Sequence, residues 1–518
     1  MDRASDPIAL AAIVGLLLCA LVVSRTRLQN KLPPGPSPLP IIGNIHQLPL
    51  ENRHKIFAEW AKKYGDIFSF NVFHKSFVVI SSVQAAHDLL EKRGSKYSDR
   101  PRMVMLNEIM GFDPIISILP YGDRWRLHRR WFRAAFQTHT AEQLETYHNL
   151  QETGARRLLS VLLDTPADFL VHIKRYAGSS MLEIAYGHPS SSPDVEFMEW
   201  ADKLITDTFQ IASVTLIDFF PMLKNIPNWM PGNGLKRKAC ELSGMVKIMF
   251  DKPFNRAREA LAAGSTKPSF LSALLDEHSQ KGSITPEDEY NVRGAAAMVY
   301  MAGSDTTISV MTTFVLAMVL YPEVYRKAQA EVDRVVEQSR LPTFEDRAST
   351  PYLECVLKEV YRWGCPLPFV IPHQLSEDDE YRGYHLPAGT LIMPNVWAMF
   401  RDPEVFPDPD RFMPERFEGF DFSSNPNVPD PSKAAFGFGR RLCSGRSFGD
   451  STVWLFAASV LSTMDICKAK DEFGREITPE PLFVDGLINH AQPFKCDFKP
   501  RSSQAIETIV SSNKADAA

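Results

Sequence analysis

The sequence is poor in cysteine and has no excess of positive charge. Seven cysteines are scattered over 518 residues, too few for the disulfide framework of a small secreted domain. No Cys-x-x-Cys or His-x-x-x-His pair occurs, so the usual spacing of a structural zinc site is absent. The 57 basic residues are outnumbered by 62 acidic ones, which argues against a general nucleic-acid-binding protein. Apolar residues make up 44% of the chain and charged residues 23%, so there is enough apolar material for a large globular core.

A long uncharged run lies near the N-terminus. Eighteen residues separate Asp6 from Arg25, and as a helix they would span about 27 Å, the thickness of the thin hydrocarbon layer of the endoplasmic reticulum. Arg25, Arg27 and Lys31 follow this run, whereas in a cleaved signal peptide the basic residues precede it. We therefore expect residues 1–31 to be a single-pass anchor in the endoplasmic reticulum membrane, with the catalytic body in the cytosol. A buried core helix is the alternative.

Proline content and periodicity divide the rest of the chain. Five prolines within residues 33–40 exclude a helix or a central strand, so residues 32–50 are predicted to be a stiff, extended hinge. Residues 51–500 then form the body, and residues 501–518 form a polar tail that frays. Helical periodicity dominates the body, which predicts a mainly α fold with a smaller β region. The predicted helices span residues 51–64, 82–93, 285–320, 350–363 and 444–463, and the predicted strands span residues 68–72, 76–80, 384–386 and 390–393.

One further segment is amphiphilic. Residues 226–232 contain Trp229 and Met230 and are followed by three basic residues at 236–238. Such a segment could dip into the surface of a bilayer. An ordinary loop between two helices is the alternative.

The longest predicted helix begins after Thr285. The Thr285 hydroxyl can cap the helix, Pro286 suits the first helical position, and Glu287 and Asp288 complement the positive end of the helix dipole. At about 35 residues it would be about 50 Å long, enough to cross a domain. The run Ala-Gly-Ser-Asp-Thr-Thr at residues 302–307 places small polar groups at the centre of this otherwise apolar helix. Such a conflict with helix propensity is expected where a helix serves function.

One cysteine lies in a glycine-rich loop that opens a helix. Residues 436–445 read Phe-Gly-Phe-Gly-Arg-Arg-Leu-Cys-Ser-Gly, and the cysteine is Cys443. Backbone N–H groups and the positive end of the helix stabilise a thiolate there. A thiolate held in this way is a metal ligand or a nucleophile. The sequence identifies no histidine partner for a nucleophile, whereas Arg441 offers a cation for a haem propionate.

The pattern F-x-x-G-x-R-x-C-x-G resembles the haem-binding loop of the cytochrome P-450 haem-thiolate monooxygenase superfamily. Further family motifs follow in the family's order over residues 121–445, and residues 376–389 look most like fungal microsomal members, which act in secondary metabolism or oxidise foreign aromatics. The resemblance implies the cytochrome P-450 fold with an N-terminal transmembrane anchor helix. It also implies one haem b (iron protoporphyrin IX) with Cys443 as the axial iron ligand.

The resemblance implies that one oxygen atom from O2 is inserted into a hydrophobic organic substrate. The run at residues 302–307 is similar to the family's oxygen-activation motif. On that match Thr306 would hydrogen-bond to dioxygen, directly or through water, Asp305 would feed the proton relay, and Ala302 would face the porphyrin. The presence of both the acid and the hydroxyl counts against a haem-thiolate isomerase or dehydratase acting without O2, which remains the alternative. A tethered non-catalytic adaptor and a cysteine hydrolase are more distant alternatives.

Other motifs are implied to hold the haem. Trp125 and Arg129 share one helix face and resemble the family's W-x-x-x-R motif, and His373 matches a further propionate donor. Glu359 and Arg362 match the family's E-x-x-R motif, and Arg416 would complete a structural network that fixes the proline-rich segment beneath the haem. The implied cofactor-binding residues are Trp125, Arg129, His373, Arg441, Phe436, Gly439, Gly445 and Ala302.

The electrons are implied to come from another protein. The chain contains no recognisable flavin or nicotinamide site, so the resemblance points to NADPH–cytochrome P-450 reductase, or to a cytochrome b-type donor. Arg126, Arg130 and Arg133 share a different helix face from Arg129 and are the predicted docking residues.

The implied substrate is small and hydrophobic: a terpenoid, polyketide, alkaloid, steroid or polycyclic aromatic. The other predicted partner is membrane lipid, and no nucleic acid is expected. Pocket residues are inferred from their positions relative to the motifs, with core packing as the alternative for each. They are Met105, Phe112, Met298, Val299, Leu367, Phe369, Val370 and Leu487.

Overall fold

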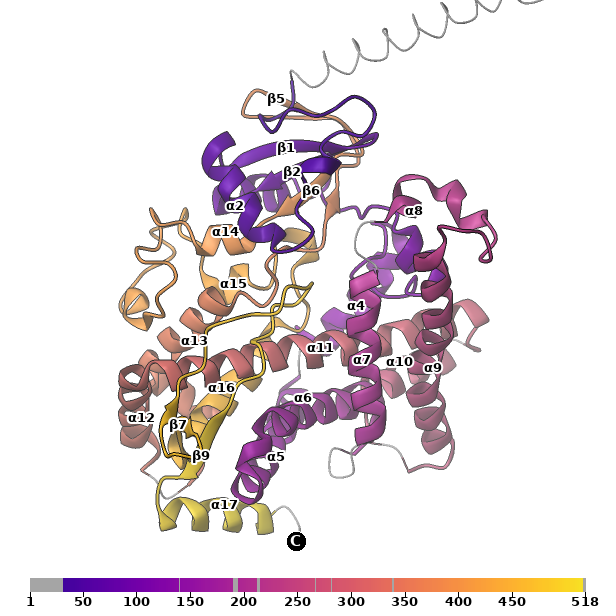
Figure 1. Cartoon of the computed structure of the whole chain (residues 1–518). Coiled ribbons are helices and arrows are strands. Elements are labelled where there is room, and N and C mark those ends of the chain that lie inside the picture. The colour runs from indigo at the N-terminus through magenta and orange to yellow at the C-terminus, as the bar shows by residue number, and fades with distance from the viewer. Residues whose placement is uncertain are drawn as a thin grey trace, which may run out of the picture.

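Helix α11 (Pro286–Leu320) crosses the middle of the molecule, and other helices surround it (Figure 1). The computed structural model describes residues 31–138, 140–189, 194–211, 215–265, 267–280, 282–337 and 340–515. Among these residues α11 alone is long and apolar enough to cross a bilayer, but 78% of its most apolar 18-residue window is buried inside the protein. It is therefore the central core helix. Apart from Lys31, the predicted anchor at residues 1–31 lies outside the described residues.

The predicted start and end of α11 are confirmed. Thr285 Oγ1 accepts a hydrogen bond from Asp288 N at 3.1 Å, and the Asp288 carboxylate accepts one from Thr285 N at 3.3 Å. This capping box satisfies donors that the first helical turn leaves free. Apolar residues lie on every side of the helix, which is the pattern of a helix buried all round.

The fold is mainly helical, as predicted. The strongly periodic segments form helices close to their predicted bounds, because burial of one face reinforces their helix propensity. The described α-helices are α2 (Arg53–Tyr64), α3 (Val83–Ala86), α4 (Asp123–Phe136), α5 (Ala141–Asp164), α6 (Phe169–Tyr186), α7 (Val195–Ile211), α8 (Leu216–Phe219), α9 (Gly234–Ala262), α10 (Phe270–Gln280), α11, α12 (Pro322–Val336), α13 (Pro351–Gly364), α14 (Val396–Phe400), α15 (Pro431–Ala434), α16 (Arg446–Thr463) and α17 (Ser503–Ala515).

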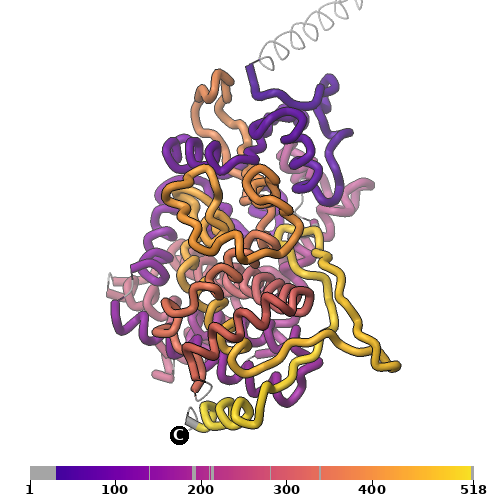
Figure 2. Tube along the Cα trace, turned by 90° about the vertical axis from the view of Figure 1, so that its left-hand side faces the viewer, coloured from indigo at the N-terminus to yellow at the C-terminus, as the bar shows by residue number. Residues whose placement is uncertain are grey.

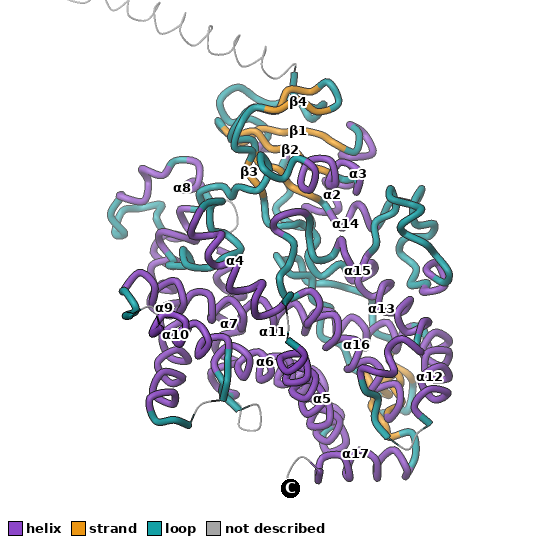
Figure 3. The backbone as a smooth tube through the Cα atoms, turned by 180° about the vertical axis from the view of Figure 1, so that it is seen from behind, coloured by secondary structure: helices purple, strands orange, loops and turns teal. Residues whose placement is uncertain are grey.

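The strands form a smaller region, most of it at one end of the molecule (Figure 3). They are β1 (Ile67–Val72), β2 (Lys75–Ile80), β3 (His373–Gln374), β4 (Asp379–Tyr381), β5 (Tyr384–Leu386), β6 (Leu391–Pro394), β7 (Met464–Lys470), β8 (Glu476–Ile477) and β9 (Cys496–Pro500). The largest sheet has the order β1-β2-β6-β3, in which β2 and β6 are parallel and the other pairs are antiparallel. A separate sheet has the order β8-β7-β9, and the loop between β8 and β9 runs along one side of the molecule (Figure 2).

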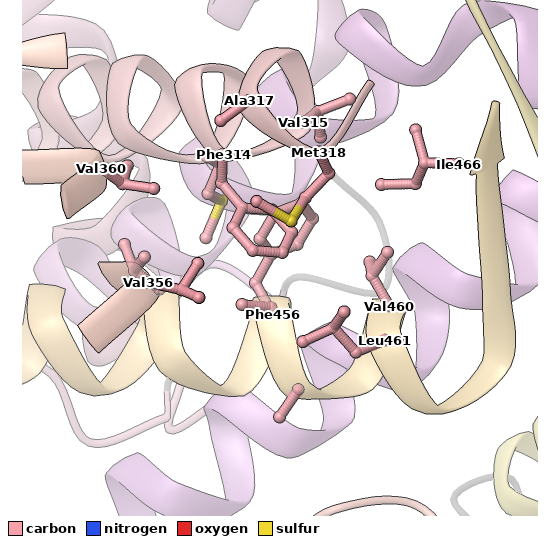
Figure 4. Packing of buried hydrophobic residues seen from close by; sticks show 14 of the residues in the cluster. Phe314, Val315, Ala317, Met318, Val356, Val360, Phe456, Val460, Leu461 and Ile466 are labelled. Carbon is pink, nitrogen blue, oxygen red and sulfur yellow. The ribbon is translucent and has the colours of Figure 1, made fainter. Parts of the chain in front are cut away.

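The main core lies between α11, α13 and α16. Phe314 and Met318 of α11 face Phe456 and Val460 of α16 (Figure 4). The rings of Phe314 and Phe456 meet edge to face with their centroids 5.9 Å apart. Because this packing is dense, it fixes α16 against α11. The glycine-rich loop that ends at the start of α16 is thereby fixed relative to α11.

A buried ion pair organises the proline-rich segment. Glu359 of α13 accepts hydrogen bonds from Arg362 Nε at 2.7 Å and from Arg416 Nε at 3.2 Å, and Glu359 and Arg362 are both fully buried. Glu359 also accepts a hydrogen bond from the backbone N–H of Met413, and Arg362 donates to the carbonyl of Phe400. Removing one member of such a pair leaves an uncompensated buried charge, which costs about 3–5 kcal/mol.

The predicted hinge is not a free spacer. Leu32 and Pro33 are buried, and the carbonyls of Pro33 and Pro34 accept hydrogen bonds from the side chain and the backbone N–H of Ser69 in β1. Prolines lack an N–H group but keep the carbonyl, so a proline-rich segment can still accept hydrogen bonds from the edge of a sheet.

The prediction that residues 501–518 fray was wrong for most of this tail. Ala505 and Ile509 are buried, and Arg501 pairs with Asp333 of α12 at 2.6 Å. The tail is polar in composition, but two apolar residues four positions apart give α17 one face that packs on the body.

Candidate functional site

The loop at residues 436–445 is held in a closed shape by its glycines. The backbone N–H of Cys443 donates to the carbonyl of Phe436 at 3.0 Å, which joins the two sides of the loop. Gly437 and Gly439 have positive φ angles of 86° and 58°. A Cβ on Gly439 would lie 1.9 Å from the carbonyl oxygen of Leu90, so a larger residue there would have to move the backbone.

The thiol of Cys443 is accessible yet lies in a dense protein environment. Its side chain is exposed, but burial of the surrounding region raises the pKa of the thiol. The backbone N–H of Gly445 and the nearby Arg129 and Arg446 act in the opposite direction on this pKa. The loop therefore offers the sulfur a hydrogen-bond donor and two cations, which favour a thiolate once it binds a metal ion.

A second feature is a cluster of buried cationic groups beside this loop. Arg441 donates to the carbonyls of Ser98 and Leu119, each at 2.8 Å, and its guanidinium lies 4.7 Å from the ring centre of Trp125. Arg100 donates to the carbonyls of Ser117 and Pro372 at 2.9 Å. Within the described part of the chain, no carboxylate lies at ion-pair distance from either guanidinium.

The pKa shifts in this cluster reflect desolvated positive charge, which the nearby Asp99 offsets only in part by raising the pKa of both arginines. Burial lowers the pKa of Arg100 well below its usual value, and the neighbouring Arg441 lowers it further. Burial also lowers the pKa of Arg441, to about 10. His373 donates from Nδ1 to the carbonyl of Tyr97 at 2.7 Å, and its buried Nε2 has no partner among the described residues. Burial and then Arg100 lower the pKa of His373.

This set of groups matches the chemistry of haem b. The buried guanidinium of Arg100, the half-buried guanidinium of Arg441 and the unpartnered Nε2 of His373 favour an anionic partner, and the two propionates of haem can supply one. The thiol of Cys443 is two residues from Arg441 in the same loop, and it can ligate the iron. The residues present therefore fit the group.

Sequence reasoning missed Arg100. It lies in a non-periodic segment before Pro101, and no local pattern marks it. Its burial arises because residues 98–100 pack between the segment at 116–119 and the start of β3.

Arg129, which was predicted, contacts the cysteine loop. It donates to the carbonyl of Leu442 at 2.7 Å and to Ser444 Oγ, so it supports the loop directly.

The centre of α11 carries a stripe of half-buried residues. Met298, Ala302 and Thr306, spaced four residues apart, are half-buried on a helix whose other central residues are mostly buried. Thr306 Oγ1 donates to the carbonyl of Ala302 at 2.7 Å, and the carboxylate of Asp305 pairs with His490 at 2.8 Å. His490 was not among the predicted residues, because it lies in a loop distant in sequence.

One segment contacts both the cysteine loop and α11. Arg441 donates to the carbonyls of Ile116 and Leu119, and Ser117 Oγ lies 3.9 Å from the sulfur of Met298. The cysteine loop and the half-buried stripe of α11 therefore both lie next to residues 116–119.

The predicted pocket residues fall into two groups. Met105 and Phe112 are 1% and 0% exposed within an apolar core cluster, and Phe369 packs on Phe57 with ring centres 5.7 Å apart. All three pack against other apolar side chains, and their assignment to the pocket stays a prediction. Val299 and Val370 are also buried, whereas Met298, Leu367 and Leu487 are half-buried.

The arginines of α4 separate as their spacing predicts. Arg126, Arg130 and Arg133 are exposed, and Arg129 is half-buried against the cysteine loop. Arg440, also exposed, donates to the hydroxyl of Tyr121, whose ring lies 5.5 Å from the Arg126 guanidinium. A cationic surface therefore lies directly outside the loop that holds Cys443.

A mainly helical protein with a desolvated thiol and a buried cation cluster of this kind has the features of a haem-thiolate protein. The comparisons with known proteins agree with this description. A family model described as Cytochrome P450 matches residues 33–498. Cytochrome P450 monooxygenase 176 of Postia placenta is 48% identical over 505 residues, covering 96% of each chain. Tryptamine 4-monooxygenase of Psilocybe cyanescens is 36% identical over 509 residues, covering 96% of this chain and 99% of that protein.

The chain belongs to the cytochrome P450 family. It is a monooxygenase whose cofactor is cysteine-ligated haem.

We expect Arg100→Met to weaken haem retention by about 10- to 100-fold, because charged hydrogen bonds are worth about 1.5–3 kcal/mol. The rate of haem transfer to excess apomyoglobin measures the effect. Arg102→Met is the matched control, since Arg102 is exposed and pairs with Glu108 at 2.6 Å. Equal haem loss from both variants would contradict the assignment of Arg100 to the anion site.

Proposed function

We propose that Cys443 is the axial haem ligand of an enzyme that inserts one oxygen atom from O2 into a small hydrophobic substrate. The observation that carries the proposal is the accessible thiol of Cys443 in the same loop as Arg441, whose half-buried guanidinium and that of the buried Arg100 have no carboxylate at ion-pair distance in the described residues. Haem bound through a thiolate supplies the O–O bond cleavage, since the sulfur donates electron density to the iron. The protein supplies position, protons and the exclusion of water.

In this proposal Thr306 and Asp305 handle protons. The Thr306 hydroxyl donates to the Ala302 carbonyl, so its lone pairs remain able to accept a hydrogen bond. Asp305 is the adjacent acid and is held by His490. A hydroxyl and the carboxylate of the next residue can together pass a proton toward dioxygen, directly or through water. This pair also disfavours the second candidate, an isomerase or dehydratase that needs no O2; turnover without NADPH would support that candidate.

The substrate is proposed to be a terpenoid, polyketide, alkaloid, steroid or polycyclic aromatic. The half-buried stripe on α11 and the half-buried Leu367 and Leu487 are mostly apolar, which supports a hydrophobic ligand. The name of one relative specifies tryptamine, a small aromatic amine, as the compound that protein oxidises.

The electrons are proposed to come from NADPH through a separate reductase, or from a cytochrome b-type donor. The exposed Arg126, Arg130 and Arg133 support docking of an acidic partner beside the loop that holds Cys443.

The enzyme is proposed to be attached to the endoplasmic reticulum membrane by its N-terminus. Two exposed apolar segments support contact of the body with lipid: Ile41 and Leu50 are 71% and 90% exposed, and Met222 and Trp229 are 74% and 78% exposed. Large apolar side chains at such exposure are unfavourable in water and favourable at a bilayer surface.

The haem ligand is tested by Cys443→Ser. We expect the variant to lose the red-shifted absorption band of the reduced carbon monoxide complex, because an alcohol is a much weaker ligand and electron donor than a thiolate. Cys467→Ser, at another exposed cysteine, is the matched control and should keep the band. A normal band from Cys443→Ser would refute the proposal.

The proton role is tested by Thr306→Ala. We expect the variant to retain haem and substrate binding, while the product formed per NADPH falls by about tenfold or more and hydrogen peroxide accumulates. Thr307→Ala is the control, since the Thr307 hydroxyl is buried on the other side of the helix and donates to Gly303. Unchanged product yield from Thr306→Ala would exclude Thr306 from the relay.

The docking surface is tested by replacing Arg126, Arg130 and Arg133 together with glutamine. We expect the rate of haem reduction by the reductase to fall by about tenfold at low salt, with a smaller loss at high salt, because salt screens complementary charges.

The control for the docking surface replaces the exposed Lys247, Lys252 and Arg256 of α9 with glutamine, which removes the same charge from another face. If both triple variants are reduced at the same rate, the surface on α4 is not the docking site.

A further inference from the structure

The partner of Asp305 is an ionisable side chain from a different part of the chain. His490 Nε2 lies 2.8 Å from Asp305 Oδ1, and the two side chains are 30% and 25% exposed. His490 lies in the loop between β8 and β9, which runs along one side of the molecule (Figure 2). Histidine is the side chain whose charge changes near neutral pH, so this pair can exchange a proton under physiological conditions.

The position of His490 is set by the residue before it. Asn489 is 5% exposed, its side chain donates to the carbonyl of Gly364, and its backbone N–H donates to the carbonyl of Pro366. Its own carbonyl accepts a hydrogen bond from Ser309 Oγ at 2.8 Å. Because Ser309 is four residues after Asp305 on α11, the loop lies alongside the helix for one turn. These contacts direct His490 to Asp305.

Other charged groups lie in the neighbourhood of this pair. Asp202 of α7 lies 3.5 Å from the exposed Lys174 of α6. Burial raises the pKa of Asp202 and Lys174 lowers it, while Asp305 raises it and His490 lowers it. The charged groups around His490 are therefore its partner Asp305 from α11, Asp202 from α7 and Lys174 from α6, and the His490 side chain itself reaches solvent.

We propose that His490 is the proton donor to Asp305, and that His490, whose side chain is 30% exposed, regains its proton directly from solvent. This inference rests on the proposed roles of Asp305 and Thr306 and adds the source of their protons. His490 is a positioning residue in this scheme, because it acts through Asp305.

The proton steps balance. The N–H bond of the His490 imidazolium breaks and an O–H bond forms on Asp305, leaving a neutral imidazole and a neutral carboxyl group. Asp305 then gives this proton to the Thr306 hydroxyl as that hydroxyl releases its own proton toward dioxygen. The neutral imidazole, which is partly exposed, is reprotonated from solvent. Overall, the substrate, O2, NADPH and one proton give the hydroxylated product, water and NADP⁺.

Carbon monoxide, which binds haem where dioxygen binds, is a probe that needs no known substrate. In the full-length, haem-loaded protein we expect the C–O stretching band of the reduced carbon monoxide complex to shift when the pH is changed from about 5 to about 8. We expect His490→Gln to abolish this pH-dependent shift. His490→Lys should abolish it too, because the lysine keeps a positive charge beside Asp305 but holds its proton across this range.

The matched control is His385→Gln, since His385 lies 3.9 Å from Asp378 in the β4–β5 hairpin, away from α11. It should retain the wild-type shift. A wild-type band that does not move with pH, or one that moves equally in His490→Gln, would overturn the inference.

Failure of the proposed function gives a different result. If Cys443 does not ligate haem, the reduced wild-type protein shows no red-shifted carbon monoxide band, and if the protein is an isomerase or dehydratase, the band is present but turnover needs no NADPH. A normal band whose C–O stretch is insensitive to His490 contradicts the role of His490 alone.

Discussion

Desolvated positive charge without an ion-paired carboxylate is the constraint on which the site depends. Arg100 and Arg441 are drawn into one cluster by backbone carbonyls, and no carboxylate of the described chain pairs with either. Burying such charges costs several kcal/mol each unless an anion joins them. The apoprotein therefore carries an unfavourable electrostatic arrangement that the propionates of the family's haem can relieve, and this links cofactor binding to the stability of the fold.

The fold holds the cation cluster and the thiol of Cys443 in fixed positions relative to α11. Dense packing of Phe314 against Phe456 fixes α16 on α11, and the loop that ends in Cys443 leads directly into α16. The buried Glu359–Arg362 pair fixes the irregular segment that leads into the same loop. Long stretches without regular structure are thus held by a few buried polar contacts, which replace the hydrogen bonds of a helix or sheet.

The proposed routes for electrons and protons use different segments of the chain. The exposed arginines of α4 lie beside the cysteine loop, whereas His490 lies in the loop between β8 and β9 and pairs with Asp305 of α11.

Much of the fold and the core of the site could be predicted from the amino-acid sequence. The capped helix from Thr285 to Leu320, the small polar run at its centre and the glycine-rich loop around Cys443 are local patterns, and local patterns are encoded by neighbouring residues. Arg100, His490 and Asn489 could not be predicted, because their roles arise from contacts between segments up to several hundred residues apart. The docking of the tail through Ile509 and the packing of the proline segment on β1 were likewise decided by tertiary burial, which overrides composition and local propensity.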